Sequence, residues 1–161
     1  VVREGVICNP GTHTKWIGHA EQAITGFTTA MTGEIFALLR QHSILAPDLA
    51  SLPVDDTDFA DGVAKGLASA AWFAQLFTAR AARLLDRVRD NPSSYLSGLL
   101  IGADVAAALE GREGEAIAVM GRGDLCGLYR SALRQAGHEA VIVDGAQAFC
   151  AGALAIGKEL A

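Results

Sequence analysis

Hydroxyl and cationic side chains follow a Pro-Gly turn near the start of the chain. Directly after Asn9-Pro10 come Gly11, Thr12, His13, Thr14 and Lys15, and apolar segments lie on both sides of the run. A turn needs the proline and the glycine, but it does not need this density of polar groups. Backbone N–H groups, threonine hydroxyls and the lysine charge together suit phosphate oxygens.

We therefore predict that the whole run from Gly11 to Lys15 binds phosphate, chiefly through Thr12 and the turn backbone. The alternative is a plain polar hairpin turn. In that case Lys15 is a solvated strand residue, and His13 packs against Trp16 or caps the turn. The Walker pattern GxxxxGK[ST] is absent from the sequence, so a P-loop is not expected.

A second candidate site is a glycine-containing loop late in the chain, made of Gly121, Arg122, Gly123 and Asp124. Here a predicted strand ends and a helix begins at Asp124. Glycines tolerate unusual φ angles and let the backbone approach a ligand, and a helix N-terminus favours anions. The loop is therefore predicted to bind adenosine. The alternative is an ordinary strand-to-helix turn in which Asp124 is the N-cap.

Two further features are candidates for substrate binding. The run Thr32-Gly33-Glu34 either lines a cleft near the substrate or only opens a helix. Arg80 lies among apolar residues, and a guanidinium there needs an anion. It could meet a substrate carboxylate, or it could pair with one of Asp55, Asp56 and Asp58.

Neither cysteine nor histidine spacing indicates a metal site within the chain. Cys8, Cys126 and Cys150 are widely separated and have apolar neighbours, so we expect all three to be buried thiols in a reducing cytoplasm. His42 is expected to be a core histidine on an apolar helix face.

Composition limits the classes of function. The 161 residues suffice for one domain or one lobe, and 51% of them are hydrophobic. A net charge of −5 argues against a nucleic-acid partner, so an anionic ligand must be held by local groups. The uncharged stretch from residue 91 to 103 is too short to span a membrane. We expect no nucleic acid and no membrane among the partners.

The hydrophobic pattern predicts the elements that would position these residues. An antiparallel meander of strands is expected first, at 4–8, 14–22 and 23–31. Helices are expected next, at 34–45, 58–69, 72–88 and 95–110. Gly98 and Gly102, four apart in the last of these, should let it pack closely on a neighbour. Two strand-helix units then follow, with strands at 115–121 and 138–144 and helices at 124–137 and 146–160, which implies parallel strands.

This order defines the fold class as α/β and matches one lobe of the actin-like ATPase fold. Three separated sequence blocks then carry a closer resemblance: "PGTHTKW", "FTTAMTGEI" leading to "LLRQHSIL", and "YLSGLLIGADV". In these blocks the chain resembles the C-terminal half of the 2-keto-3-deoxygalactonate kinases, also called 2-dehydro-3-deoxygalactonokinases. The resemblance covers nearly all of residues 1–161.

The resemblance implies an activity with ATP and Mg²⁺ as cofactors. The γ-phosphoryl group of ATP would be transferred to the terminal hydroxyl of 2-dehydro-3-deoxy-D-galactonate, giving its 6-phosphate in galactonate catabolism. The partners would be ATP and the small-molecule sugar acid, with a homodimer possible.

The resemblance also implies parts that these residues do not supply. The family carries an N-terminal lobe with a phosphate hairpin of the form D-x-G-[ST]-[TN], and a Gly-Glu-Glu stretch upstream of "PGTH" where related kinases place the catalytic base. We therefore expect no catalytic residue in this chain and no kinase activity from it alone. The alternatives are a non-catalytic actin-like module that binds a nucleotide or sugar acid, and a structural lobe that only self-associates.

Overall fold

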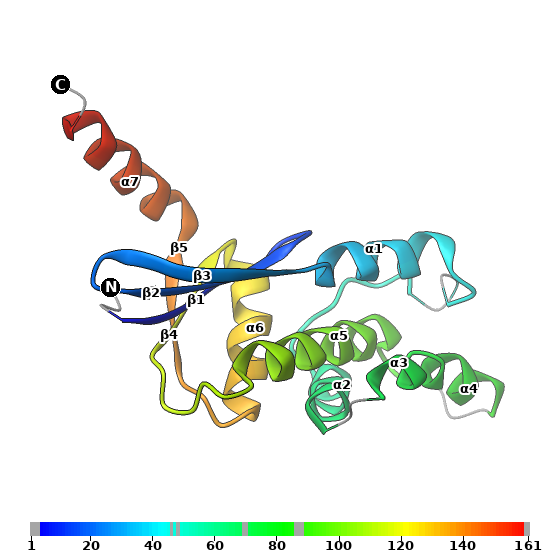
Figure 1. Ribbon diagram of the computed structural model, residues 1–161. Helices are drawn as coiled ribbons and strands as arrows, with labels where there is room; N and C mark the ends of the chain where they lie inside the picture. The colour runs from blue at the N-terminus through cyan, green and yellow to red at the C-terminus, as the bar shows by residue number, and fades with distance from the viewer. Residues whose placement is uncertain (1–3, 46, 48, 69–70, 86–88, 160–161) are drawn as a thin grey trace.

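A five-stranded mixed sheet with helices forms the protein, as Figure 1 shows for the computed structural model. The structure describes residues 4–45, 47, 49–68, 71–85 and 89–159. In sheet order the strands are β3 (Ala23–Ala30), β2 (Thr14–Ala20), β1 (Gly5–Asn9), β4 (Ile117–Gly121) and β5 (Ala140–Asp144). The α/β lobe expected from the sequence is confirmed.

The three N-terminal strands form the predicted meander. β1 pairs antiparallel with β2, and β2 pairs antiparallel with β3. Glu21 and Gln22 join β2 to β3 with positive φ angles of 50° and 64°, the signature of a type I′ hairpin turn. β4 pairs parallel with β1, and β5 pairs parallel with β4, so the two C-terminal strand-helix units are confirmed as well.

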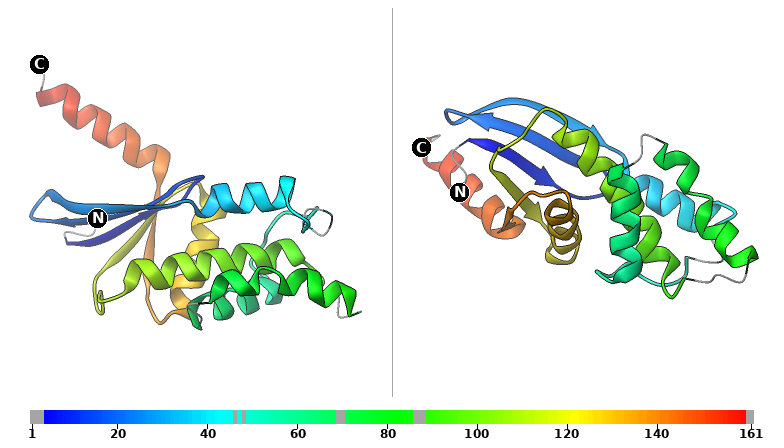
Figure 2. Two further views of the ribbon diagram at one scale, coloured as in Figure 1. Left: turned by 45° about the vertical axis from the view of Figure 1, so that its right-hand side comes forward. Right: turned by 90° about the horizontal axis from the view of Figure 1, so that it is seen from below.

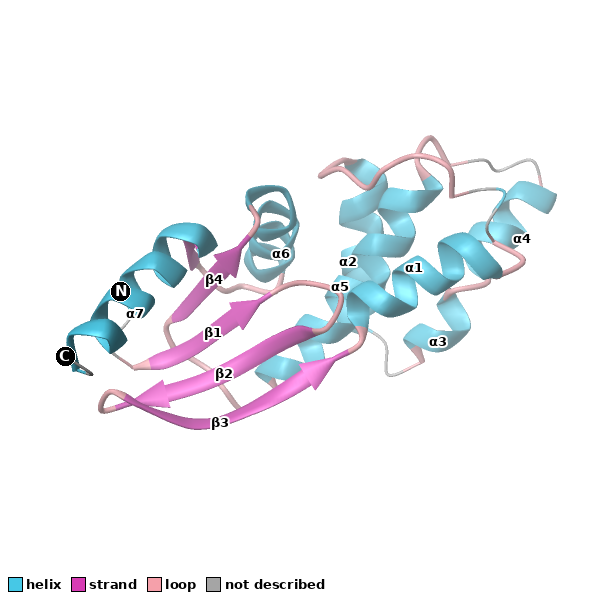
Figure 3. Ribbon diagram, turned by 90° about the horizontal axis from the view of Figure 1, so that it is seen from above, coloured by secondary structure: helices cyan, strands magenta, loops and turns pink. Residues whose placement is uncertain are grey.

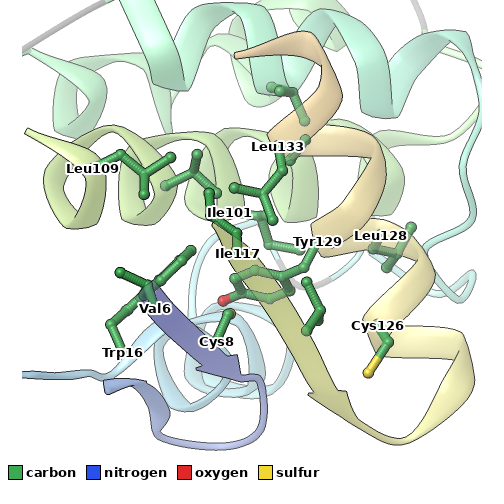
Figure 4. Close-up of a cluster of buried hydrophobic side chains, with 14 of the residues drawn as sticks. Val6, Cys8, Trp16, Ile101, Leu109, Ile117, Cys126, Leu128, Tyr129 and Leu133 are labelled. Atoms are coloured by element: carbon green, nitrogen blue, oxygen red, sulfur yellow. The ribbon is translucent and has the colours of Figure 1, made fainter. Parts of the chain in front are cut away.

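Helices cover one face of this sheet (Figure 2). α5 (Pro92–Leu109) and α6 (Gly123–Gln135) pack on the sheet, and α2 (Thr57–Ala68) packs on α5. α1 (Thr32–His42) continues from β3 and lies beside α5. Figure 4 shows the core between them, where Cys8 and Trp16 of the strands meet Tyr129 of α6 and Ile101 of α5.

Glycines allow α2 and α5 to approach at backbone distance. A Cβ on Gly62 would lie 2.9 Å from the backbone nitrogen of Leu99, and a Cβ on Gly98 would lie 3.0 Å from that of Val63. Gly66 and Gly102 make equivalent approaches one turn further along. The close packing predicted for Gly98 and Gly102 is thus confirmed, and they meet the α2 backbone at Phe59, Val63 and Gly66.

The single helix predicted over 72–88 is wrong. The chain instead forms two short helices, α3 (Trp72–Gln75) and α4 (Thr78–Leu84), and Val88 lies outside the described residues. The hydroxyl of Thr78 donates to the carbonyl of Gln75 at 2.7 Å, the kind of local bond with which threonine competes against helix propagation. Phe73, Phe77 and Leu84 are exposed and form no buried face.

Other burial predictions also need correction. Cys150 is exposed, whereas Cys8 and Cys126 are buried as expected. His42 is exposed because the apolar contacts of α1 run through Ile35, Phe36 and Leu39 instead. Within the part of the chain that the structure describes, no helix has the length and apolar character needed to cross a membrane.

α7 (Gly145–Glu159) extends away from the rest of the molecule, beyond the end of β5 (Figure 1). Its large apolar side chains Phe149, Leu154 and Ile156 are between 61% and 76% exposed. On β3, Ile24 and Phe27 are exposed to a similar degree. Exposed apolar side chains on these two elements are available to pack against another body.

Candidate functional site

A cleft of about 750 Å³ opens between several parts of the fold. Its lining includes the turn after β1, with Pro10, Gly11 and Thr12; the start of α1, with Thr32 and Gly33; and α6 with the loop before it. Residues of the 52–55 loop and of α5 complete the lining. Figure 3 shows why the turn, α1 and the loop before α6 meet: β1 and β4 end, and β3 runs into α1, on the same side of the sheet.

Positive charge predominates on the walls of this cleft. Four arginines line it, against two aspartates: Arg40, Arg122, Arg130 and Arg134, and Asp55 and Asp124. The chain as a whole carries a net charge of −5. The charged residues of the lining therefore have a net sign opposite to that of the molecule, which favours an anion.

The turn and α1 are in direct backbone contact. The N–H of Glu34 donates to the carbonyl of Thr12 at 2.9 Å. A Cβ on Gly33 would lie 2.9 Å from the Cα of Thr12, so only glycine fits there. The run Thr32-Gly33-Glu34 thus opens a helix, and its first two residues also line the cleft.

The other predicted phosphate ligands point elsewhere. His13 forms a short hydrogen bond with the carboxylate of Glu34 on the exposed side of α1, and the ammonium of Lys15 donates to the carbonyl of His13 at 3.1 Å. Thr14 is fully buried, with its hydroxyl 2.8 Å from that of Tyr129. Only Gly11 and Thr12 of the five predicted residues line the cleft.

Of the four residues in the predicted adenosine loop, likewise only some line the cleft. Arg122 and Asp124 line the cleft, whereas Gly121 and Gly123 do not. The guanidinium of Arg122 donates to Asp124 at 2.7 Å, and this hydrogen bond lowers the pKa of the Asp124 carboxyl. The same pairing raises the pKa of Arg122.

Two details of that loop correct the sequence interpretation. α6 begins at Gly123 with Arg122 as its N-cap residue, so Asp124 belongs to the first turn and is not the N-cap. Neither Gly121 nor Gly123 has the positive φ that would demand glycine. Around Gly123 there is open space, which is compatible with a ligand, whereas Gly121 lies against Pro10.

Arg80 is not brought to this cleft. It lies on α4 and is absent from the described residues that line the cavity. Of the acidic residues considered as its partners, Asp58 accepts a hydrogen bond from Arg89 at 3.0 Å, and Asp55 accepts one from Ser131 at 3.0 Å. Asp56 accepts the N–H of Phe59 in the first turn of α2.

A buried polar cluster behind the cleft was not anticipated from the sequence. Asp104 of α5 accepts hydrogen bonds from the indole of Trp16 at 2.9 Å, the hydroxyl of Thr32 at 2.7 Å and the hydroxyl of Tyr129 at 2.7 Å. The only signal in the sequence was a lone carboxylate inside an otherwise uncharged helix. Its partners come from three distant elements, which no local pattern reveals.

The two buried thiols lie near this cluster. Burial chiefly raises the pKa of Cys8, with smaller contributions from Asp104 and Cys126. Burial likewise raises the pKa of Cys126. Both thiols therefore stay protonated at neutral pH and are poor nucleophiles. Among the described residues no group of three or more His, Cys, Asp or Glu side chains could hold a metal ion.

Comparison with known proteins identifies the family of this chain. A family model described as 2-keto-3-deoxy-galactonokinase matches residues 2–156. The chain belongs to the 2-keto-3-deoxy-galactonokinase family.

Two curated relatives agree with this family. One, from Rhizobium meliloti (strain 1021), carries the name "Probable 2-dehydro-3-deoxygalactonokinase" and is 34% identical over 161 residues, covering 96% of this chain and 53% of its own length. The 2-dehydro-3-deoxygalactonokinase of Escherichia coli (strain K12) is 36% identical over 154 residues, with 94% and 53% covered. The chain thus spans about half the length of these curated relatives.

A solved structure agrees as well. The chain superposes with a TM-score of 0.92 and 33% identity on a crystal structure from Sinorhizobium meliloti provisionally assigned as a 2-dehydro-3-deoxygalactonokinase. The match covers 99% of this chain and 55% of that one. The fold described above is therefore that of one lobe of a sugar kinase of this family.

Proposed function

We propose that this chain provides one lobe of an ATP-dependent kinase that phosphorylates the 6-hydroxyl of 2-dehydro-3-deoxy-D-galactonate. The observation that carries the proposal is the cleft itself. It joins the turn at Gly11 and Thr12, the start of α1 and the start of α6 around a cavity lined by more arginines than carboxylates. Family membership supplies the expected reaction.

Within the cleft we assign the phosphates to the turn and the start of α1. Gly11 and Thr12 offer backbone N–H groups and a hydroxyl, and the N-terminus of an 11-residue helix carries partial positive charge. Phosphoryl transfer depends mostly on positioning and on charge neutralisation, and such groups supply both. His13, Thr14 and Lys15 act by supporting the turn in this assignment.

Adenosine is assigned to the side of the cleft at Arg122 and Asp124. The open space around Gly123 leaves room for a ribose or base. The sugar acid would lie nearer to Thr32 and Gly33. The role suggested for Arg80 has no support from the cleft geometry, because α4 does not contribute to the lining.

The residues present fit a magnesium ion that arrives with the nucleotide. Mg²⁺ is usually held by one or two carboxylates together with substrate phosphates and water. The cleft offers the carboxylates of Asp55 and Asp124. Bound there, the ion would neutralise charge on the transferring phosphoryl group.

The catalytic base is proposed to come from the part of the kinase beyond this lobe. The family resemblance implies that the base lies in a Gly-Glu-Glu stretch upstream of "PGTH", and residues 1–161 contain no such stretch. The exposed apolar side chains of α7 and β3 give such a second lobe a surface to pack against. Residues 1–161 would then form a C-terminal lobe, and a cytoplasmic location would follow from the metabolic role.

A coupled assay of ADP release tests this function. The whole gene product should release ADP from MgATP only when 2-dehydro-3-deoxy-D-galactonate is present, and residues 1–161 alone should not. Sugar-acid-independent binding of ATP without turnover would favour a non-catalytic nucleotide-binding module. Turnover by residues 1–161 alone near the typical enzyme median of about 10 s⁻¹ would contradict the two-lobe proposal.

A further inference from the structure

The buried polar cluster consists of Asp104 with Trp16, Thr32 and Tyr129, and Thr14 behind Tyr129. All five side chains are at most 9% exposed. Tyr129 donates its proton to Asp104, so the hydroxyl of Thr14, 2.8 Å away, donates to the Tyr129 oxygen. A chain of hydrogen bonds therefore runs from Thr14 through Tyr129 to Asp104.

The donors of this cluster come from three elements, and two of them, Thr32 and Tyr129, line the cleft. Thr32 is the first residue of α1 and lines the cleft. Tyr129 lies on α6 and also contributes to the lining. Thr14 begins β2 directly after the turn, and Trp16 follows two residues later. One carboxylate thus joins β2, which follows directly after the turn, to α1 and α6 from behind the cleft.

The chemistry of the cluster requires a carboxylate at this point. The indole N–H and the two hydroxyls all donate, and an ionised carboxylate only accepts. Within the described residues no arginine or lysine forms an ion pair with Asp104, so these donors are what hold its charge. Buried hydrogen bonds to a charged group are strong and directional, which fixes the geometry of the groups that make them.

A structural explanation is that Asp104 only satisfies buried Trp and Tyr donors in the core. That explanation accounts for Trp16, which lies within the sheet. It does not account for Thr32, because a threonine at the start of a helix would ordinarily face solvent or cap its own helix. Here its hydroxyl instead points into the core and donates to Asp104 of α5, which lies 72 residues later in the sequence.

We propose that Asp104 is a positioning residue, which sets the placement of the phosphate turn and the start of α1 relative to α6 for phosphoryl transfer. This inference rests on the proposed kinase function. A misplacement of about 1 Å at a reacting centre can cost on the order of 100-fold in rate. Substrate binding, which tolerates such shifts better, should change less.

The test compares Asp104→Asn and Tyr129→Phe with a stability control in the whole gene product. Asn keeps the size of Asp104 but replaces one acceptor by a donor group, and Phe keeps the ring of Tyr129. Val63→Ala removes buried volume from α2 without removing any donor and serves as the control. We expect kcat to fall by about tenfold or more in the first two variants, with KM for ATP within about twofold of wild type.

The double variant tests whether the two side chains affect kcat through one network or independently of each other. Because both side chains act through one network, Asp104→Asn combined with Tyr129→Phe should lower kcat little more than Asp104→Asn alone. Equal kcat values for Asp104→Asn and wild type, or an equal loss of kcat in Val63→Ala at matched melting temperature, would overturn the proposal.

Hydrogen exchange decides the inference even when the assay shows no turnover. In Asp104→Asn, amides of residues 10–14 and 32–36 should exchange faster than in wild type, and those of β5 should not. An inactive wild type would contradict the proposed function alone. Unchanged exchange at the turn and at α1 would contradict the positioning role, whatever the activity.

Discussion

Three roles are divided among five neighbouring residues after β1. Gly11 and Thr12 line the cleft, His13 and Lys15 brace the turn from its exposed side, and Thr14 anchors it to the core. The residue types indicated a phosphate site, but residue type alone does not show which way each side chain points. Strand alternation turns Thr14 inward and Lys15 outward, and only the start of the turn is left to face a ligand.

Thr12→Val in the whole gene product tests the turn at this scale. Valine keeps the branched shape of threonine but removes the hydroxyl, and a hydrogen bond to a charged group is worth roughly 1.5–3 kcal/mol. We expect kcat/KM for ATP to fall about tenfold or more. Thr29→Val on the exposed edge strand β3 is the matched control and should leave kcat/KM unchanged. An unaltered value for Thr12→Val would make Thr12 an ordinary turn residue.

The three thiols should differ in reactivity. Burial raises the pKa of Cys8 and Cys126, so a smaller fraction of each is thiolate at pH 8 than in an unfolded chain, whereas Cys150 is exposed. In residues 1–161, a chromogenic disulfide reagent at pH 8 should therefore label one thiol rapidly, and unfolding in denaturant should release the other two. Rapid labelling of all three in the folded chain would show that the core described here is wrong.

At the scale of elements, local patterns predicted most of the fold. The meander and the two parallel strand-helix units follow from alternation and helical periodicity, which are local signals. The break between α3 and α4 was missed because it depends on the hydroxyl of Thr78, which contacts both Gln75 and Tyr95. The cluster around Asp104 was missed because its members lie up to 115 residues apart.

The glycine contacts between α2 and α5 give a prediction at this scale. An alanine in a solvent-exposed helix is usually more stable than glycine by about 1 kcal/mol. At Gly62 the added methyl would meet the backbone of α5, so Gly62→Ala should instead destabilise the lobe by about 1–3 kcal/mol. Gly127→Ala on α6 meets open space and should be neutral or stabilising. Chemical denaturation of the two variants checks the difference, and equal stabilities would refute the backbone contact.

At the scale of the whole molecule, two observations support the proposal that a second lobe packs against this one. The chain spans about half the length of its curated relatives, and α7 and β3 expose large apolar side chains. Arg122 and Asp124 line the cleft and are largely exposed to solvent. We infer that the phosphate turn and the loop at Arg122 form half of a nucleotide site, which a second lobe completes.

Hydrogen exchange of the whole gene product with and without MgATP tests this account most directly. We predict that MgATP slows amide exchange in three separate segments, residues 10–14, 32–36 and 121–127, because all three meet at the cleft. The hairpin at residues 20–27 lies outside the cleft lining and should be unaffected. Protection of none of the three segments by a saturating concentration of MgATP would contradict the assignment of this cleft as the nucleotide site.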